Sequence, residues 1–258
     1  MPSSSDVAAD AARVMLITGA SRGIGAATAR LAAAGGYDVV VNFARDEAAA
    51  MRVVTDCRAL GARAVIDRAD VADETQVVGM FERTVEEFGR VDVLVNNAGI
   101  LHQQMRFDEM TVERWRELFE VNVVGAFLCA REAVRHMSTR HGGAGGVIVN
   151  VSSMAAVLGS PAEYVDYAAS KGAIDTLTIG LGKEVAAEGV RVVGVRPGAI
   201  RTDIHASGGE PDRVDRVARS VPMQRGGEPE EVAATILWLA SDAAAYITAT
   251  SVDCSGGR

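Results

Sequence analysis

The chain has little of what disulfide-rich, metal-binding, nucleic-acid-binding or membrane-spanning proteins need. Its only cysteines, Cys57, Cys129 and Cys254, are too scattered for a disulfide framework or a zinc site, and we expect them to be small buried hydrophobic residues. The histidines show no metal-ligand spacing, so no metal site is expected. The net charge of -8 is spread along the chain, without the basic stripe that nucleic-acid binding requires.

Long apolar segments are also missing. No apolar run approaches the roughly 20 residues that span a bilayer, and residues 1–13 lack the apolar core of a signal peptide. We therefore expect a cytoplasmic protein without nucleic-acid or membrane partners.

Apolar residues make up 48% of the chain, which is enough for a sizeable core. From Arg13 onward, short β-rich runs alternate with amphipathic helical runs, which is typical of βαβ units and a parallel sheet. We expect one domain over residues 13–258, preceded by a disordered tail over residues 1–12. Strands are expected at 14–18, 37–43, 64–67, 91–95, 146–151 and 248–254, with another before Pro197, and helices at 26–34, 47–60, 74–88, 111–140, 167–181 and 229–239.

A glycine-rich corner follows the first expected strand and leads directly into a helix. Its spacing is G-x-x-x-G-x-G, and glycines here let the backbone turn tightly and approach a pyrophosphate at a helix N-terminus. The pattern predicts a dinucleotide site, and a plain glycine-rich turn is the alternative. The predicted cofactor contacts of this corner are Gly19, Ser21, Arg22, Gly23, Ile24 and Gly25.

The end of the second expected strand bears on which nicotinamide cofactor binds. An acidic residue there would bond the ribose hydroxyls and repel a 2′-phosphate, but residues 42–44 contain none. Arg45 follows instead, and together with Arg22 it would converge on a 2′-phosphate. We therefore expect NADP(H) in preference to NAD(H). The alternative is that both arginines are solvated, and Asp46 and Glu47 would weaken the local positive field.

Two further segments are predicted to contact the cofactor. Asp70, just beyond a strand, would accept from the adenine amino group, or it is a residue of the turn that approaches the next helix. Small residues after the fourth strand let a ribose lie close to the backbone, with a plain turn as the alternative. The predicted contacts are Asp70, Val71, Asn97, Ala98 and Gly99.

Candidate catalytic residues lie further along the chain. Asn122 is a polar amide among valines in the expected 111–140 helix, which we expect to be irregular near Gly125. If buried, this amide needs partners, and water bound at a helix irregularity would supply them; a purely structural role is the alternative. The strand at 146–151 places Ser152 and Ser153 at its carboxyl end, where ligands bind in open α/β sheets.

Tyr167 and Lys171 are four residues apart, so a helix places both side chains on one face. A nearby positive charge favours a phenolate and lowers the pKa of the phenol, which suits proton transfer to or from an alcohol oxygen. The alternative is a core tyrosine beside a solvated lysine. Tyr164 has Ala168 four residues on, so it lacks a charge partner and is interpreted as a packing or substrate-wall residue.

These motifs, in this order and over nearly the whole chain, resemble the classical short-chain dehydrogenases/reductases. The resemblance implies one Rossmann-type, doubly wound α/β domain, with a seven-stranded parallel sheet of order 3-2-1-4-5-6-7 and helices on both faces. It also implies that Ser153 binds the substrate oxygen, Tyr167 exchanges the proton, and Lys171 bonds the nicotinamide ribose. Asn122 would hold a water that links Lys171 to solvent. The segment that covers the nicotinamide would contribute Pro197, Gly198, Ile200 and Thr202.

The resemblance has limits near the substrate. The gap from Ser153 to Tyr167 is one residue longer than the family's commonest spacing, so Ser152 stays an alternative to Ser153. The insertion is expected within residues 159–164, and a substrate-covering loop within about 200–227. In that loop His205 is interpreted as an exposed histidine, with substrate contact as the alternative.

The expected function is hydride transfer between NADPH and a carbonyl or secondary alcohol of small size. A lyase or epimerase on the same fold, or a non-catalytic sensor of NADP(H), is the alternative. The helix that continues from Tyr167 is small or apolar around much of its circumference, which favours a homo-oligomer, tetrameric or dimeric as in the family. Packing within a single chain is the competing explanation.

Overall fold

The structure is a computed structural model that describes residues 12–258. Within these residues, parallel strands form one seven-stranded sheet of order β3-β2-β1-β4-β5-β6-β7, as the family resemblance implied. The predicted disorder of residues 1–12 lies, apart from Ala12, outside the described residues. The strands are β1 (Val14–Ile17), β2 (Asp38–Phe43), β3 (Ala64–Arg68), β4 (Val93–Asn96), β5 (Gly146–Val151), β6 (Val190–Pro197) and β7 (Thr250–Cys254).

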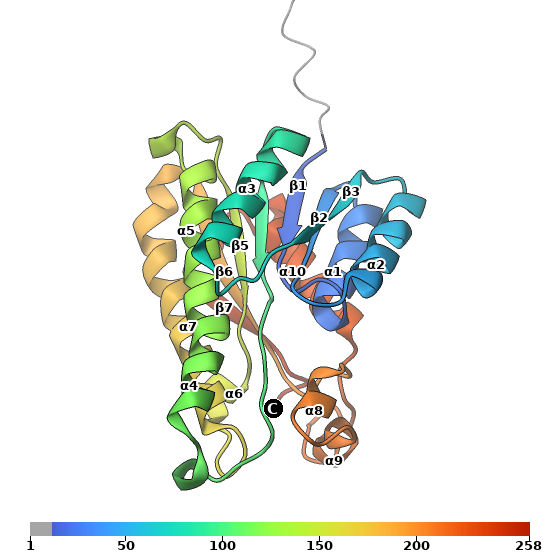
Figure 1. Cartoon of the computed structure of the whole chain (residues 1–258), viewed down its shortest axis with the longest axis vertical. Helices are drawn as coiled ribbons and strands as arrows, with labels where there is room; N and C mark the ends of the chain where they lie inside the picture. The colour runs from blue at the N-terminus through green and yellow to red at the C-terminus, as the bar shows by residue number, and fades with distance from the viewer. Residues whose placement is uncertain (1–11) are drawn as a thin grey trace, which may run out of the picture.

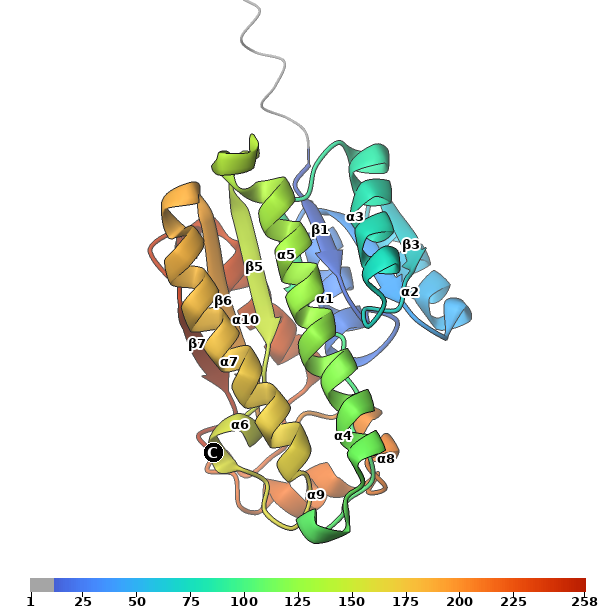
Figure 2. The ribbon, with the colours of Figure 1, turned by 60° about the vertical axis from the view of Figure 1, so that its left-hand side comes forward.

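Helices cover both faces of the sheet (Figures 1 and 2). Helices α1, α2 and α10 pack on one face, and α3, α5 and α7 pack on the other. The helices are α1 (Gly23–Ala34), α2 (Glu47–Ala59), α3 (Glu74–Phe88), α4 (Val112–Phe119), α5 (Gly125–Met137), α6 (Ala155–Leu158), α7 (Val165–Val185), α8 (Ile204–Ser207), α9 (Arg213–Ala218) and α10 (Pro229–Ala240).

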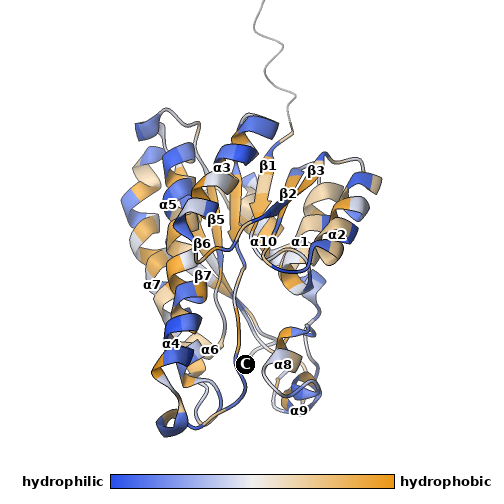
Figure 3. Ribbon diagram, viewed as in Figure 1, coloured by the Kyte–Doolittle hydropathy of each residue, from blue (hydrophilic) through white to orange (hydrophobic). Residues whose placement is uncertain are grey.

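The central strands are apolar throughout because each of their faces is covered. Along β1, Met15 and Ile17 point into the core beneath α1 and α10, whereas Leu16 points into the core beneath α3 and α5. Figure 3 shows these apolar strands between helices that contain both hydrophobic and hydrophilic residues. Cys57 and Cys129 are buried as expected, and Cys254 is partly buried.

Local capping explains the best-predicted helix, α3. Asp73 accepts a hydrogen bond from the backbone N–H of Gln76 at 3.1 Å and begins the helix, and Gly89, with a φ of 82°, ends it. The long helix expected over residues 111–140 runs from Val112 to Met137, and the irregularity expected near Gly125 is confirmed: a π-helical turn, Glu120–Val124, joins α4 to α5.

The carboxyl ends of the parallel strands share one edge of the sheet. The start of α4 together with α6, α8 and α9 lies beyond this edge, below the sheet in Figure 1. The strand order reverses between β1 and β4, which is the position where open α/β sheets bind ligands. None of the helices in residues 12–258 is long and apolar enough to cross a bilayer.

Candidate active site

The glycine-rich corner between β1 and α1 lies against the end of β4. Gly19 has a φ of 62°, and a Cβ atom on it would lie 2.9 Å from the Cα of Ala98. A Cβ atom on Gly25 would lie 2.6 Å from the Nδ2 of Asn97. No side chain caps the start of α1 at Arg22, so N–H groups of its first turn are available to an anion. The corner therefore has the close backbone approach that a pyrophosphate needs.

Asn42, at the end of β2, holds this corner in place. Its Oδ1 accepts from the N–H of Gly19 at 3.1 Å, and its Nδ2 donates to the carbonyl of Ala69 at 3.0 Å. Asn97 acts from the other side by donating to the carbonyl of Thr18 at 2.8 Å. In the sequence, Asn42 is notable only because it carries no negative charge at the end of the strand. Its tethering role was missed because it depends on how the corner, β2 and β3 lie in space.

One cavity of about 860 Å³ extends from this corner to the segment expected to cover substrate. Ser153 also lines it, whereas Gly25 and Asn122 do not. The predicted cofactor residues that line the cavity are Gly19, Ser21, Arg22, Gly23, Ile24, Arg45, Asp70, Val71, Asn97, Ala98, Gly99, Tyr167, Lys171, Pro197, Gly198, Ile200 and Thr202.

The structure is compatible with both roles considered for Asp70, a ligand contact and a turn residue before α3. Asp70 is exposed and lines the cavity, and its Oδ1 also accepts from the N–H of Ala72 at 3.0 Å in the turn before α3. The carboxylate is therefore both part of a helix-approach turn and available to a ligand.

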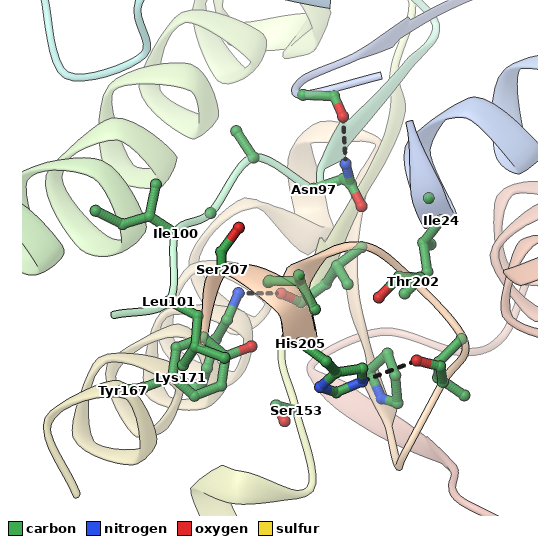
Figure 4. Close-up of a pocket in the computed structure, with 18 of the residues that line it drawn as sticks. Ile24, Asn97, Ile100, Leu101, Ser153, Tyr167, Lys171, Thr202, His205 and Ser207 are labelled. Carbon is green, nitrogen blue, oxygen red and sulfur yellow. Dashed lines mark hydrogen bonds between the residues drawn. The ribbon is translucent and has the colours of Figure 1, made fainter. Parts of the chain in front are cut away.

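Tyr167 and Lys171 lie on one face of α7, as their spacing predicted. The Nζ of Lys171 is 5.7 Å from the centre of the Tyr167 ring and donates to the carbonyl of Val151 at 2.8 Å. Figure 4 shows both side chains at the same end of the cavity as Ser153. The strand end of β5 and the first turns of α7 thus hold a phenol, an ammonium and a hydroxyl around one volume.

Burial dominates the ionisation of this group. It raises the pKa of Tyr167 to about 12, and the Ser153 hydroxyl opposes only part of the rise. Burial also lowers the pKa of Lys171 to about 8, against the negative charge of Asp175. The lowered phenol pKa expected from the Tyr167 and Lys171 spacing is therefore absent here, because desolvation of the phenolate exceeds the opposing effect of the Ser153 hydrogen bond.

Asn122 lies in the π-helical turn and is 1% exposed. Its Oδ1 accepts from the N–H of Ile100 at 2.8 Å, and its Nδ2 donates to the carbonyl of Ile100 at 3.0 Å and to the Oγ of Ser170 at 3.3 Å. A Cβ atom on Gly99 would lie 3.3 Å from the Asn122 Oδ1 and 3.6 Å from the Lys171 Nζ. Asn122 and Lys171 therefore flank the same glycine.

The two neighbouring serines have different environments. Ser152 is buried, and its hydroxyl donates to the carbonyl of Lys171 at 3.1 Å. Ser153 is partly buried, accepts from the N–H of Ala155 at 3.1 Å, and acts on the pKa of Tyr167. Of the two hydroxyls, that of Ser153 is the one associated with the phenol.

The expected substrate-covering loop, residues 200–227, begins and ends at one place. Ile200 pairs with Gly227 in an isolated parallel bridge. A Cβ atom on Gly23 would lie 3.3 Å from the Cγ2 of Thr202, so the beginning of the loop lies against the glycine-rich corner. The segment predicted to cover the nicotinamide and the glycine-rich corner are thus in contact.

Helix α8 was not expected, and it changes the interpretation of His205. This side chain is partly buried, with its Nε2 2.9 Å from the carbonyl of Ile200, so the prediction of an exposed loop histidine is wrong. Burial lowers its pKa. Tyr164 is buried, its ring lies 5.0 Å from the guanidinium carbon of Arg213, and its hydroxyl donates to the carbonyl of Gly208 at 3.1 Å. Tyr164 is therefore both a packing and a cavity-wall residue.

Similar sequences fit this geometry. Residues 19–258 match a family model described as enoyl-(acyl carrier protein) reductase. An uncharacterised oxidoreductase of Escherichia coli is 55% identical over 245 residues, which cover 95% of this chain and 99% of that protein. A 3-oxoacyl-[acyl-carrier-protein] reductase of Synechocystis is 40% identical over 247 residues, which cover 95% and 96% of the two chains.

Solved structures of similar proteins share the whole fold. A 3-ketoacyl-(acyl-carrier-protein) reductase from Brucella melitensis, determined with NADH, has a TM-score of 0.88 at 34% identity and covers 96% of this chain and 98% of its own. Levodione reductase has a TM-score of 0.89 at 31% identity with the same coverage. With these matches and its β3-β2-β1-β4-β5-β6-β7 sheet, the chain belongs to the classical short-chain dehydrogenase/reductase family of oxidoreductases.

Proposed function

We propose that this protein transfers hydride between a nicotinamide cofactor and a small carbonyl compound or secondary alcohol. The observation that carries the proposal is the convergence of Ser153, Tyr167 and Lys171 at one end of a cavity whose other end is the glycine-rich corner. Reductases of 3-oxoacyl groups and of levodione are among the similar proteins, which supports carbonyl chemistry.

The residues of the chain have separate tasks in this reaction. A bound nicotinamide supplies or accepts the hydride at the substrate carbon. Ser153 donates a hydrogen bond to the substrate oxygen, and Tyr167 donates its proton in reduction or accepts one in oxidation. Burial raises the pKa of Tyr167 to about 12, so the phenolate that forms when Tyr167 donates its proton needs a neighbouring positive charge to stabilise it.

Lys171 and Asn122 support the proton transfer. The ammonium of Lys171 stabilises the phenolate that forms when Tyr167 gives up its proton, and it is placed to bond the nicotinamide ribose. Asn122 and Lys171 flank Gly99, where a water held by the amide would connect the ammonium to solvent and replace the proton. In this role Asn122 acts through Lys171 and does not touch the substrate.

NADP(H) is the proposed cofactor form. The exposed side chains of Arg22 and Arg45 both line the cavity, and neither makes an ion pair with another residue in the range 12–258. The Asp46 carboxylate caps α2 by accepting from the N–H of Ala49 at 2.9 Å, so it is directed at the helix backbone. The Brucella relative was determined with NADH, so the competing cofactor needs a direct comparison.

The comparison is a titration of the protein and of Arg45→Ala with NADPH and with NADH. We expect tighter NADPH binding by the unmodified protein, and a loss of about 1 kcal/mol of this preference in the variant, as for a partly exposed charge-assisted hydrogen bond. An unchanged preference in Arg45→Ala would remove the arginine argument.

The reaction itself is tested by following oxidation of NADPH in the presence of ketones, aldehydes and 3-oxoacyl thioesters. Consumption with one substrate group, abolished in Tyr167→Phe, supports the proposal; full turnover by Tyr167→Phe refutes the assigned mechanism. Tight NADPH binding without consumption in either redox direction favours a sensor. Conversion of substrate without net change in the cofactor favours a lyase or epimerase.

A homo-oligomer is the proposed assembly. Phe127 on α5 and Ile179 on α7 expose large apolar side chains at 45% and 42%, in addition to the small residues along α7. Apolar side chains on neighbouring helices are typical of subunit contacts. Light scattering coupled to size exclusion would give the mass, and a monomer that remains a monomer at high concentration would contradict this assembly.

A further inference from the structure

A cluster of four charged side chains lies beside the cavity, and two of them, Glu163 and Arg213, line it. Glu163, in the loop before α7, lies 2.6 Å from the Nη2 of Arg213 and 3.0 Å from the Nη2 of Arg216. Glu210, in the covering loop, pairs with the same two arginines. We call these four residues the latch, since they join the wall of the cavity to the loop that covers it.

Neutral hydrogen bonds reinforce the latch. The carbonyl of Gly208 accepts both from the Tyr164 hydroxyl at 3.1 Å and from the N–H of Gln104 at 3.2 Å. The N–H of Met105 donates to the carbonyl of Glu163 at 3.1 Å. Three segments distant in sequence are therefore tied together beside the cavity: residues 103–105, 160–164 and 208–216.

The wall segment, residues 160–164, lies within the range 159–164 where the one-residue insertion is expected. Ser160 and Ala162 have φ values of 44° and 60°, a conformation that residues with a side chain rarely adopt. Such a backbone persists only where its surroundings hold it. The contacts of Glu163 with α9 supply part of that restraint, so the strained segment and the covering loop depend on each other.

The latch is charged and electrically balanced at neutral pH. Burial alone would raise the pKa of Glu163, but the hydrogen bond and charge of Arg213, followed by those of Arg216, outweigh it and lower the pKa. The side chain of Arg213 lines the cavity and is only 13% exposed. Arg213 is close to both carboxylates of the latch, but its Nη1 lies 3.5 Å from Glu210 and has no hydrogen-bond partner within residues 12–258.

We propose that Glu163 is a specificity-determining residue: through the latch it holds the covering loop against residues 160–164 and favours free carbonyl compounds that fit wholly inside the cavity. When the carbonyl of a substrate on a long carrier arm lies beside Tyr167, the arm must leave the cavity between the segments that surround its opening. The latch and its neighbouring hydrogen bonds tie three segments beside the cavity together, residues 103–105, 160–164 and 208–216, so they disfavour substrates that carry such an arm. This inference rests on the proposed carbonyl chemistry.

The test uses Glu163→Gln, which removes the charge and keeps the shape of the side chain. Glu87→Gln is the matched control, because Glu87 pairs with Arg63 at 2.9 Å on the exposed surface of α3, outside the cavity. The first measurement is amide hydrogen exchange over residues 208–216 of the full-length protein. We expect exchange about ten-fold faster in Glu163→Gln, the effect of losing charge-assisted hydrogen bonds that are partly exposed, and no change in Glu87→Gln.

The second measurement compares kcat/KM for ethyl 3-oxobutanoate with that for the 3-oxobutanoyl thioester of pantetheine. We expect the unmodified protein and Glu87→Gln to prefer the free ester, and Glu163→Gln to lose about ten-fold of this preference. Unchanged exchange, an unchanged substrate ratio, or an initial preference for the thioester would each overturn the inference. If the unmodified protein reduces no carbonyl compound, the proposed function fails, while the exchange measurement still decides whether the latch holds the loop.

Discussion

The buried ion pair beside Tyr167 makes a quantitative prediction about stability. The Nε of Arg114, on α4, lies 2.6 Å from a carboxylate oxygen of Asp166, on α7, and the two side chains are 10% and 1% exposed. The Nη1 of Arg114 also donates to the carbonyl of Gln103 at 2.6 Å. Asp166 in turn accepts from the N–H of Tyr167 at 2.9 Å. The pair therefore fixes the start of α7 against α4 and the cavity wall.

Arg114→Met would leave the Asp166 carboxylate buried with only the Tyr167 N–H as a partner. Removing one member of a buried pair costs about 3 to 5 kcal/mol, because the remaining charge is desolvated without compensation. In a chain of this length such a loss lowers the melting temperature by on the order of 10 °C. The matched control is Arg30→Met, since the Arg30 and Asp56 side chains are 44% and 50% exposed and their pair contributes about 0 to 1 kcal/mol.

The assay is urea denaturation followed by circular dichroism, at one protein concentration so that any subunit association affects all variants equally. A double variant, Arg114→Met with Asp166→Leu, removes both charges and should recover most of the lost stability. The reasoning is refuted if Arg114→Met costs no more than Arg30→Met, or if the double variant is no more stable than Arg114→Met alone.

Three further predictions concern the site. Tyr167→Phe should lower kcat by at least about 100-fold with little change in NADPH affinity, as loss of a general acid requires; stopped-flow and titration measurements separate the two effects. Folding lowers the pKa of Lys171 from 10.5 to about 8, so between these two pH values the unfolded chain binds more protons than the folded chain. The contribution of Lys171 to the free energy of unfolding should therefore rise from pH 8 to pH 10. Denaturation at pH 8 and at pH 10 should show this rise, and Lys171→Met should lack it. Gly19→Ala should weaken NADPH binding far more than Gly36→Ala, because both glycines have a positive φ but only at Gly19 would a Cβ meet the Ala98 backbone; equal binding by the two variants contradicts this account.

Elements whose ends carry local signals were predicted well. The strand at 146–151 and the helix at 74–88 match β5 and α3 to the residue, because hydrophobic periodicity and caps such as Asp73 and Gly89 act over a few neighbouring residues. The irregularity expected near Gly125 in the 111–140 helix is present as the π-helical turn Glu120–Val124. The partners of Asn122 in that turn, Ile100 and Ser170, are distant in sequence, so helical periodicity could not identify them.

The sequence by itself determined the alternation of strands and helices, the glycine-rich corner and the placement of Tyr167 and Lys171 on one helical face, since each depends on local patterning. The order of the strands in the sheet was implied only by the family resemblance. The tertiary structure alone decided the tether at Asn42, the latch at Glu163 and the raised pKa of Tyr167. These features depend on contacts between groups that are far apart in the chain and on the exclusion of water. The pKa of a buried group depends on every group packed around it, and those groups come together only when the strands and helices pack.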